Sequence, residues 1–210
     1  GIKNYPAKAY FEFWKNHCLL QINNRPVWKT VSNGSKQYID AFLKQFSGTV
    51  HANTPIKEVV RHPDNVIVKT LDNQLEFDRV VLACHADQTK KLLKDISATE
   101  KKALEGWAYT KNTAILHKDA SVMPPKKSAW SSWSFCQSKT ESDSPLFLSY
   151  YMNRLQNLNT DTDYFVTLND TGLINPSKII KQINYTHPNF NNITFTSRRL
   201  LKQINGENRT

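Results

Sequence analysis

The sequence predicts an α+β fold, and a change in the spacing of apolar residues carries that prediction. Apolar residues first recur at helical spacing and then, from residue 49 onwards, alternate at the spacing of strands. Residues 80–84 are apolar on both faces, which is typical of a strand inside a sheet covered on each side. We therefore expect part of a mixed sheet in the first half of the chain and an antiparallel sheet in the second.

Two amphipathic helices are expected first, at residues 7–20 and 38–46. The first carries an aromatic stripe that includes Tyr10, Phe11 and Trp14, which we expect to lie in the core. A turn at residues 32–35 precedes the second helix, and Gly48 ends it.

Short strands follow, and we expect them at residues 49–51, 56–61, 66–71 and 75–84. Asp72 and Asn73 are expected to form the hairpin turn, because both residues tolerate the positive φ of a tight reversal. Further strands are expected at residues 109–117, 130–136, 146–152 and 164–168. Helices are expected at residues 90–94, 98–106, 177–181 and 195–204.

The charge of the chain is strongly positive but scattered. The 28 Lys and Arg residues exceed the 18 Asp and Glu residues, for a net charge of +10. Such a balance suits a solvated surface, and it also leaves open a non-catalytic basic module that binds RNA or anionic lipid. The three cysteines form no CxxC pair, so we expect a free thiol at Cys84 and a reducing, cytoplasmic location. No apolar window is long enough to span a membrane, and the first residues do not resemble a secretion signal.

The motif search excludes several chemistries. The six glycines cannot form a GxGxxG or GxxxxGK[ST] loop, and the chain has no GxSxG or HExxH motif. The histidines lack ligand spacing, so we expect surface or hydrogen-bonded imidazoles and no metal site. His85 stands out, because it directly follows the apolar run at 80–84, where open α/β sheets bind ligands.

The order of segments resembles that of flavin-containing amine oxidases. The segments that carry the resemblance are residues 25–35, 49–56, 77–88, 116–119, 123–124, 129–133, 151–156 and 185–190. The closest likeness is to bacterial proteins described as predicted NAD/FAD-binding, amine-oxidase-like or protoporphyrinogen-oxidase-like. The resemblance implies the central fragment of a longer FAD-dependent oxidoreductase that transfers a hydride from an amine or other organic substrate to flavin. It also implies that the Gly-rich segments that hold most of the FAD are missing, so the fragment alone is expected to be inactive.

The resemblance assigns cofactor roles to five residues. It implies that the backbone N–H and C=O of Ile56 contact the adenine edge. Pro55, just before it, has no backbone N–H that could compete for the same acceptor. The alternative is that Ile56 is an ordinary edge-strand residue. Ala83, Cys84 and His85 match the turn that passes near the cofactor, and simple strand termination is the alternative. Gly34 matches a Gly-Gly-Ser turn in which this chain has Asn instead of the first glycine.

The resemblance also implies the domain plan and a substrate site. Residues 1–106 would form part of the FAD-binding domain, residues 107–190 the substrate domain, and residues 191–210 a segment that returns to the FAD-binding domain. The side chains expected near the substrate are Trp130, Trp133, Tyr151 and Asn153; structural roles in a core are equally open for them. The partner expected is a small molecule and not a nucleic acid, while the substrate, which could be an amine, a carotenoid-like molecule or a lipid chain, stays open. The electron acceptor, the catalytic residues and the oligomeric state stay open too.

Overall fold

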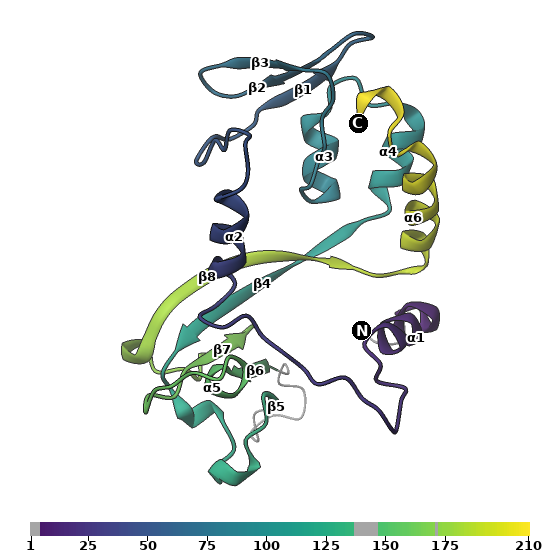
Figure 1. Ribbon diagram of the computed structural model, residues 1–210. Helices are drawn as coiled ribbons and strands as arrows, with labels where there is room; N and C mark the ends of the chain where they lie inside the picture. Colours follow the sequence, from purple (N-terminus) through teal and green to yellow (C-terminus); the bar gives the residue numbers. More distant parts are fainter. Residues whose placement is uncertain (1–4, 137–146, 171) are drawn as a thin grey trace. The chain divides into compact units, whose positions relative to one another are not determined.

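The computed structural model describes residues 5–136, 147–170 and 172–210 (Figure 1). The chain divides into a first unit, residues 1–26, 48–109 and 188–210, and a second unit, residues 27–47 and 110–187. Helices and antiparallel sheets are both present, which confirms the α+β prediction. Among the described residues, no helix is long and apolar enough to cross a membrane.

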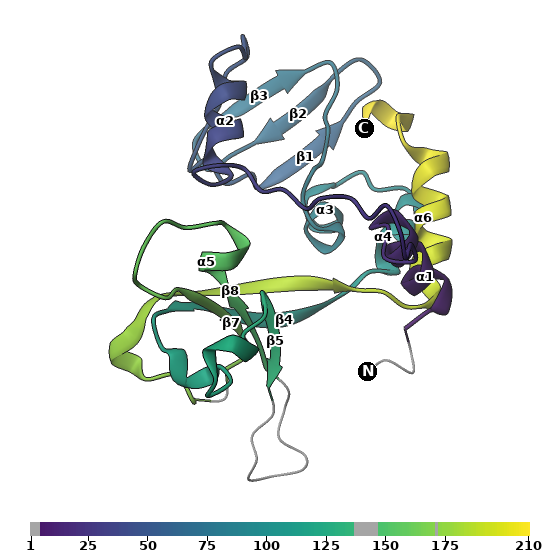
Figure 2. The ribbon, with the colours of Figure 1, turned by 60° about the horizontal axis from the view of Figure 1, so that its bottom comes forward.

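The first unit contains an antiparallel sheet of β1 (Glu58–Arg61), β2 (Val66–Lys69) and β3 (Gln74–Phe77), in that order (Figure 2). The predicted reversal at Asp72 and Asn73 is present, but neither residue has a positive φ. Instead, the Thr70 hydroxyl accepts hydrogen bonds from the N–H groups of Asp72 at 3.3 Å and Asn73 at 2.9 Å. The turn therefore depends on a threonine side chain, and not on left-handed backbone.

Alternate side chains of this sheet are buried, as expected for strands with one face on a core. Val59, Val66 and Val68 point to one side and form a small core with Leu93. Val59 pairs with Val68 across the first hairpin, as the period-two pattern predicts.

One predicted strand is absent, and the strand predicted at 75–84 is shorter than expected, because β3 ends at Phe77. Residues 49–51 form no strand. Residues 80–84 form neither helix nor strand, and within the described chain they pair with no strand; the Val80 N–H donates to Arg209 O at 3.0 Å, and Val81 is 88% exposed. The prediction of a strand buried on both faces was therefore wrong for this structure. Apolar composition favours burial, but a strand also needs a neighbouring backbone with which to pair.

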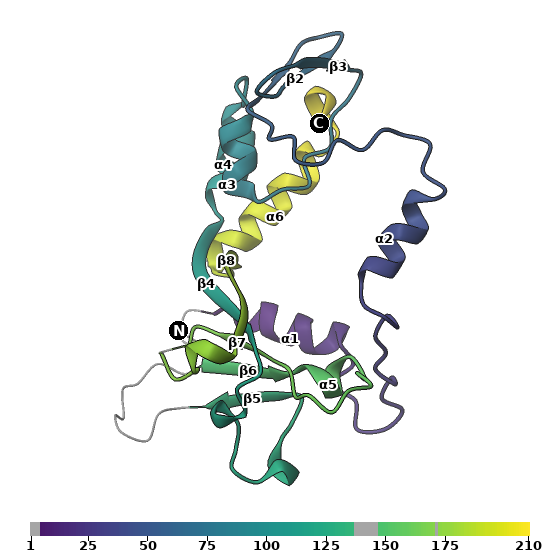
Figure 3. The ribbon, with the colours of Figure 1, turned by 90° about the vertical axis from the view of Figure 1, so that its left-hand side faces the viewer.

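The helices of the first unit are α1 (Ala7–Asn16), α3 (Ala86–Leu92), α4 (Ala98–Glu105) and α6 (Asn192–Ile204). The helix α4 begins with a capping box, since Ser97 Oγ accepts from Glu100 N–H while the Glu100 carboxylate accepts from Ser97 N–H. The helices α4 and α6 pack side by side (Figure 3).

The aromatic stripe of α1 does not lie in a core, contrary to our expectation. Tyr10, Phe11 and Phe13 are 40%, 58% and 47% exposed, and the helix ends at Asn16, before the predicted Leu20. Helical spacing identified the face but not what covers it, because burial depends on contacts that are distant in sequence.

The second unit contains α2 (Lys36–Leu43), α5 (Met152–Leu155) and most of a sheet with the order β5-β6-β7-β4-β8. Its strands are β4 (Ala108–His117), β5 (Trp133–Cys136), β6 (Phe147–Tyr151), β7 (Phe165–Leu168) and β8 (Ile179–Asn189). Its core includes Ile115, Trp130, Phe147 and Phe165. The helix predicted at 177–181 is a single 3₁₀ turn, Pro176–Lys178, which leads into the unpredicted β8. Leu146, the first residue of one predicted strand, lies outside the described residues.

Candidate functional site

The first unit contains a cavity of about 670 Å³. The extended segment 80–84 and the helices α3, α4 and α6 supply its walls. Its apolar lining residues are Val81, Leu82, Ala86, Leu93, Leu104, Pro188, Leu201 and Ile204. Its polar and aromatic lining residues are Cys84, Thr89, Glu100, Trp107, Tyr109, Lys202, Asn205 and Thr210. An apolar cavity of this size with a few polar groups is the usual form of a site for a small molecule or cofactor.

Trp107, one of the lining residues, carries an unused hydrogen-bond donor. Its Nε1 atom is buried, and it has no hydrogen-bond partner among the described residues. A buried indole N–H normally has an acceptor, because leaving it unpaired costs free energy.

The turn at residues 84–86 is held in place beside the cavity. The Tyr109 hydroxyl accepts a hydrogen bond from Ala86 N–H at 2.8 Å. The Tyr109 ring stacks on His85, with ring centroids 4.5 Å apart and planes at 17°. The exposed Cys84 is a free cysteine, and its Sγ lies 3.3 Å from Thr89 Oγ1. Of the three residues that the sequence singled out at this turn, Cys84 lines the cavity, whereas Ala83 and His85 are not among the lining residues.

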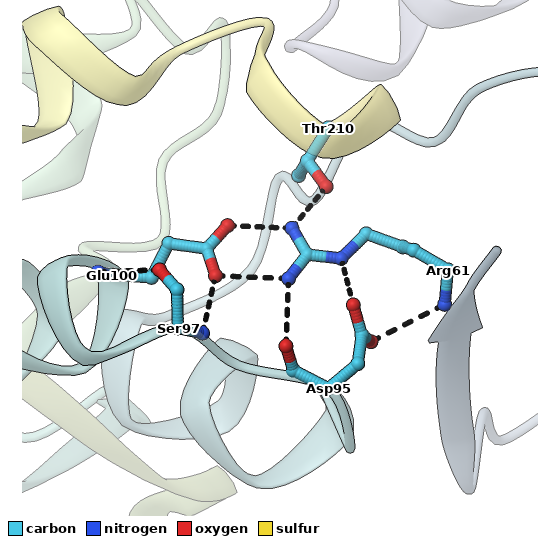
Figure 4. Close-up of polar contacts among 5 residues, drawn as sticks. All are labelled: Arg61, Asp95, Ser97, Glu100 and Thr210. Carbon is cyan, nitrogen blue, oxygen red and sulfur yellow. Dashed lines mark hydrogen bonds and ion pairs between the residues drawn. The ribbon is translucent and has the colours of Figure 1, made fainter. Parts of the chain in front are cut away.

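Arg61 organises a buried charged cluster next to the same cavity (Figure 4). Its Nη1 and Nη2 donate to the Glu100 carboxylate at 2.6 and 2.9 Å, and its Nε donates to Asp95 Oδ2 at 2.7 Å. Nη1 also donates to Thr210 Oγ1 at 2.7 Å. The Arg61 side chain is only 2% exposed, and Glu100 and Thr210 both line the cavity.

This cluster stays ionised. The hydrogen bonds from Arg61, helped by those from Ser97, lower the pKa of Glu100 to about 2 even though burial acts to raise it. The hydrogen bond to Glu100 likewise raises the pKa of Arg61. The cavity wall at Glu100 is thus anionic, but its charge is already matched by a guanidinium.

The other predicted cofactor residues lie apart from the cavity lining. Ile56 is extended and 39% exposed just before β1. The hydrogen bonds of this edge begin at Lys57, whose N–H donates to Lys69 O at 2.8 Å, and within the described chain none involves the Ile56 backbone. Gly34 belongs to the second unit, where it has a φ of +87° and follows Asn33 with a φ of +62°. Its turn is of the glycine-dependent kind that the sequence indicated, while its cofactor role stays a prediction.

Three of the four predicted substrate residues have structural partners in the second unit. Trp130 is 8% exposed, and its Nε1 donates to Pro124 O at 2.7 Å. The Tyr151 hydroxyl donates to Asp163 at 2.6 Å, which is the main cause of the raised pKa of Tyr151. The Asn153 side chain donates to Thr162 O and accepts from Tyr164 N–H, both at 2.8 Å. Only Trp133, which is 54% exposed, keeps a largely accessible ring, so substrate roles for all four stay predictions.

A buried chain of polar side chains, which no sequence pattern predicted, crosses the second-unit sheet. The His117 Nδ1 accepts from Asp119 N–H at 3.1 Å, which leaves Nε2 to donate to Thr167 Oγ1 at 2.7 Å. Thr167 in turn contacts the Ser149 hydroxyl at 2.7 Å. Burial lowers the pKa of His117, so the imidazole is neutral. His117 is therefore a hydrogen-bonded core histidine, one of the two outcomes expected for the histidines.

Sequence reasoning missed Trp107, Tyr109 and Lys202 as cavity residues. Trp107 and Tyr109 follow α4 directly, and an aromatic pair at the start of a strand is a weak signal on its own. Lys202 has the helical spacing of a solvated face.

A family model and several solved structures match this chain. The family model for flavin containing amine oxidoreductase matches residues 6–162. The fold is similar to that of a CLA-producing fatty acid isomerase from P. acnes, with a TM-score of 0.59 and 11% identity over 84% of this chain and 46% of that one. It is also similar to wild-type putrescine oxidase bound to putrescine, with a TM-score of 0.50 and 10% identity over 85% of this chain and 45% of that one. The chain thus spans less than half the length of these proteins, and no curated protein matches it. Because the family match covers most of the sequence, the chain belongs to the flavin-containing amine oxidoreductase family.

Proposed function

We propose that this chain is the central part of an FAD-dependent oxidoreductase that oxidises a small organic substrate. The first unit would contribute to the FAD site, and the second would contribute to the substrate site. The observation that carries the proposal is the family match over residues 6–162. Bound FAD would supply the two-electron redox chemistry. The residues of this chain would then bind and orient the cofactor and the substrate, and would exclude water from them.

The residues present fit part of FAD. Ile56 is 39% exposed, and its backbone makes no hydrogen bond within the described chain, which suits contact with an adenine edge. The apolar cavity walls suit a planar aromatic group. The pyrophosphate has no glycine-rich turn to hold it in this sequence, so that part of the cofactor needs residues from elsewhere.

The Arg61 cluster would hold the elements that form this site in position. Arg61 lies in β1, a few residues after Ile56, and its ion pairs join that strand to α4, which forms a cavity wall. The apolar side chains of α4 and α6 would keep water away from a bound ring. Arg61 is therefore proposed as a positioning residue, not a catalytic one.

The test is to purify the full-length protein and record its visible absorbance for bound flavin. In the same protein, Ile56→Pro removes one backbone donor, while Ile56→Val keeps it. We expect Ile56→Pro to weaken FAD binding about fivefold, the equivalent of one net hydrogen bond, and Ile56→Val to change it little. A colourless full-length protein would contradict the proposed function, whereas equal affinities of the two variants would contradict only the role of Ile56.

The substrate class is a separate question with its own assay. The similar structures are described as a fatty acid isomerase and a putrescine oxidase, and a shared fold does not choose between their substrates. We propose a small organic substrate, such as an amine. Anaerobic mixing of the flavin-loaded protein with diamines, monoamines and fatty acids would identify the class, because only a true substrate bleaches the flavin absorbance.

A further inference from the structure

A second hollow in the first unit, separate from the cavity lining described above except at Lys202, is strongly basic. This basic groove has a volume of about 350 Å³ and is lined by Lys8 and Glu12 of α1 and by Phe195, Arg198, Arg199 and Lys202 of α6. The α6 residues are spaced i, i+3, i+4 and i+7, and the α1 residues i and i+4, so each set shares one helix face. Two helix faces thus bring four cationic side chains and one carboxylate to one place.

The charges of the groove are poorly compensated. Glu12 is 3.9 Å from Lys8 Nζ and 3.8 Å from Arg198 Nη1, and all three side chains are largely exposed, so these ion pairs are weak. Within the described residues, Arg199 and Lys202 have no acidic partner. The groove therefore carries a surplus of about three positive charges, which is unfavourable unless an anion or salt screens it.

The start of α1 adds to the positive potential. This ten-residue helix has no side-chain cap and no acidic residue in its first turn, the turn that carries Lys8. Unpaired N–H groups at a helix start favour an anion. Phe195 forms an apolar part of the groove, and Lys8 Nζ lies 5.7 Å from the centre of its ring.

We propose that the basic groove binds the phosphate group of a phosphorylated ligand. A carboxylate carries one charge, whereas a phosphate monoester carries nearly two and a pyrophosphate more, so the phosphates match the surplus charge better. Paired arginines on one helix face provide the forked donors that phosphate oxygens accept. Phe195 offers a surface for an apolar portion of the same ligand. The phosphate can belong either to a soluble molecule or to a phospholipid headgroup.

The soluble arm of the test is a calorimetric titration of the full-length protein with sodium pyrophosphate. The titration is run with excess FAD present, so that any site for the flavin pyrophosphate is already filled. We expect saturable binding that Arg198→Gln/Arg199→Gln weakens at least about tenfold. Lys202 is left unchanged because it also lines the larger cavity.

The matched control is Lys101→Gln/Lys102→Gln, which removes the same charge from two exposed residues of α4 outside the groove. We expect this control to change affinity by less than about twofold at a moderate salt concentration, where distant charges are screened. Lys8→Gln is a second groove variant that leaves α6 intact, and circular dichroism checks that every variant is folded.

The lipid arm measures co-sedimentation with phosphatidylcholine vesicles, with or without phosphatidylglycerol. Binding to the anionic vesicles alone, lost in the groove variants, would assign the site to a phospholipid headgroup. Pyrophosphate binding with the same variant pattern would assign it to a soluble ligand. Absence of binding in both arms, or an equal loss in the α4 control, would overturn the proposal.

Discussion

At the scale of single residues, hydrogen bonds and ion pairs compensate the buried charge of Arg61. Its five N–H donors all face oxygen atoms of Asp95, Glu100 or Thr210. A buried ion pair is not a strong source of stability by itself, since desolvation offsets much of the attraction. Removing one partner, however, leaves the other charge buried without compensation. Substituting one partner of the cluster should therefore destabilise the protein more than substituting both partners together.

We expect Arg61→Met to lower the free energy of unfolding by about 3–5 kcal/mol, because it leaves the Glu100 and Asp95 carboxylates without their cation. Arg61→Met/Glu100→Gln should recover part of that loss. Urea denaturation followed by circular dichroism measures both. Equal stability of Arg61→Met and the unchanged protein would mean that the cluster is not buried as described.

The stability of the protein should depend on pH through Glu100. Its pKa falls from 4.5 to about 2 on folding, so below pH 4.5 the unfolded chain takes up this proton more readily than the folded one. The stabilisation is therefore complete above pH 4.5 and is lost as the pH falls towards 2. Comparison of urea midpoints near pH 6 and near pH 3 should show a smaller drop for Glu100→Gln than for the unchanged protein. If the urea midpoint fell equally in both proteins, Glu100 would not be the source of the pH dependence.

At the scale of elements, the contact between α4 and α6 depends on one glycine. Gly106 ends α4 with an ordinary helical φ of −69°, so its backbone does not require glycine. A Cβ at this position would instead overlap Ser197 Oγ and press on Ile193, both in α6. Ser197 is only 1% exposed and has little room to move. The missing side chain is what allows the two helices to approach.

We expect Gly106→Ala to destabilise the protein by about 1–3 kcal/mol, as overpacked sites do. Gly106→Ala/Ser197→Ala removes the overlapping oxygen and should restore part of that stability. Thermal unfolding of the two variants tests the contact. The matched control is Gly172→Ala in the second unit, where no atom of a described, non-adjacent residue lies within 4 Å of an added Cβ and the positive φ is what penalises alanine. If the double variant were no more stable than Gly106→Ala, overlap with Ser197 would not be the cause.

At the scale of the whole molecule, the absence of a glycine-rich phosphate loop limits what this chain can bind. A single adenine contact at Ile56 contributes roughly 1 kcal/mol, which is less than the several kcal/mol that association costs. We therefore expect the 210-residue chain, expressed alone, to retain no FAD, although a full-length protein would. The measurement is visible absorbance after purification of both. A yellow, stoichiometric 210-residue chain would refute this prediction.

Much of the local structure followed from the sequence alone. The period-two runs predicted β1, β2 and β3, and the spacing of Ser97 and Glu100 is that of the capping box that begins α4. The segment order also led to the family, which the match over residues 6–162 confirms. These features depend on interactions within a few residues, or on patterns that run along the chain, so they are visible without coordinates.

The tertiary structure decided what those elements contact. Arg61 meets Asp95, Glu100 and Thr210 across 34, 39 and 149 residues, and no spacing in the sequence indicates such a cluster. The apolar segment 80–84 and the aromatic face of α1 were both expected to be buried, yet Val81 and Phe11 are exposed. Sequence patterns determine which side of an element is apolar, because that depends on local backbone geometry. Only long-range packing determines whether another part of the chain covers that side.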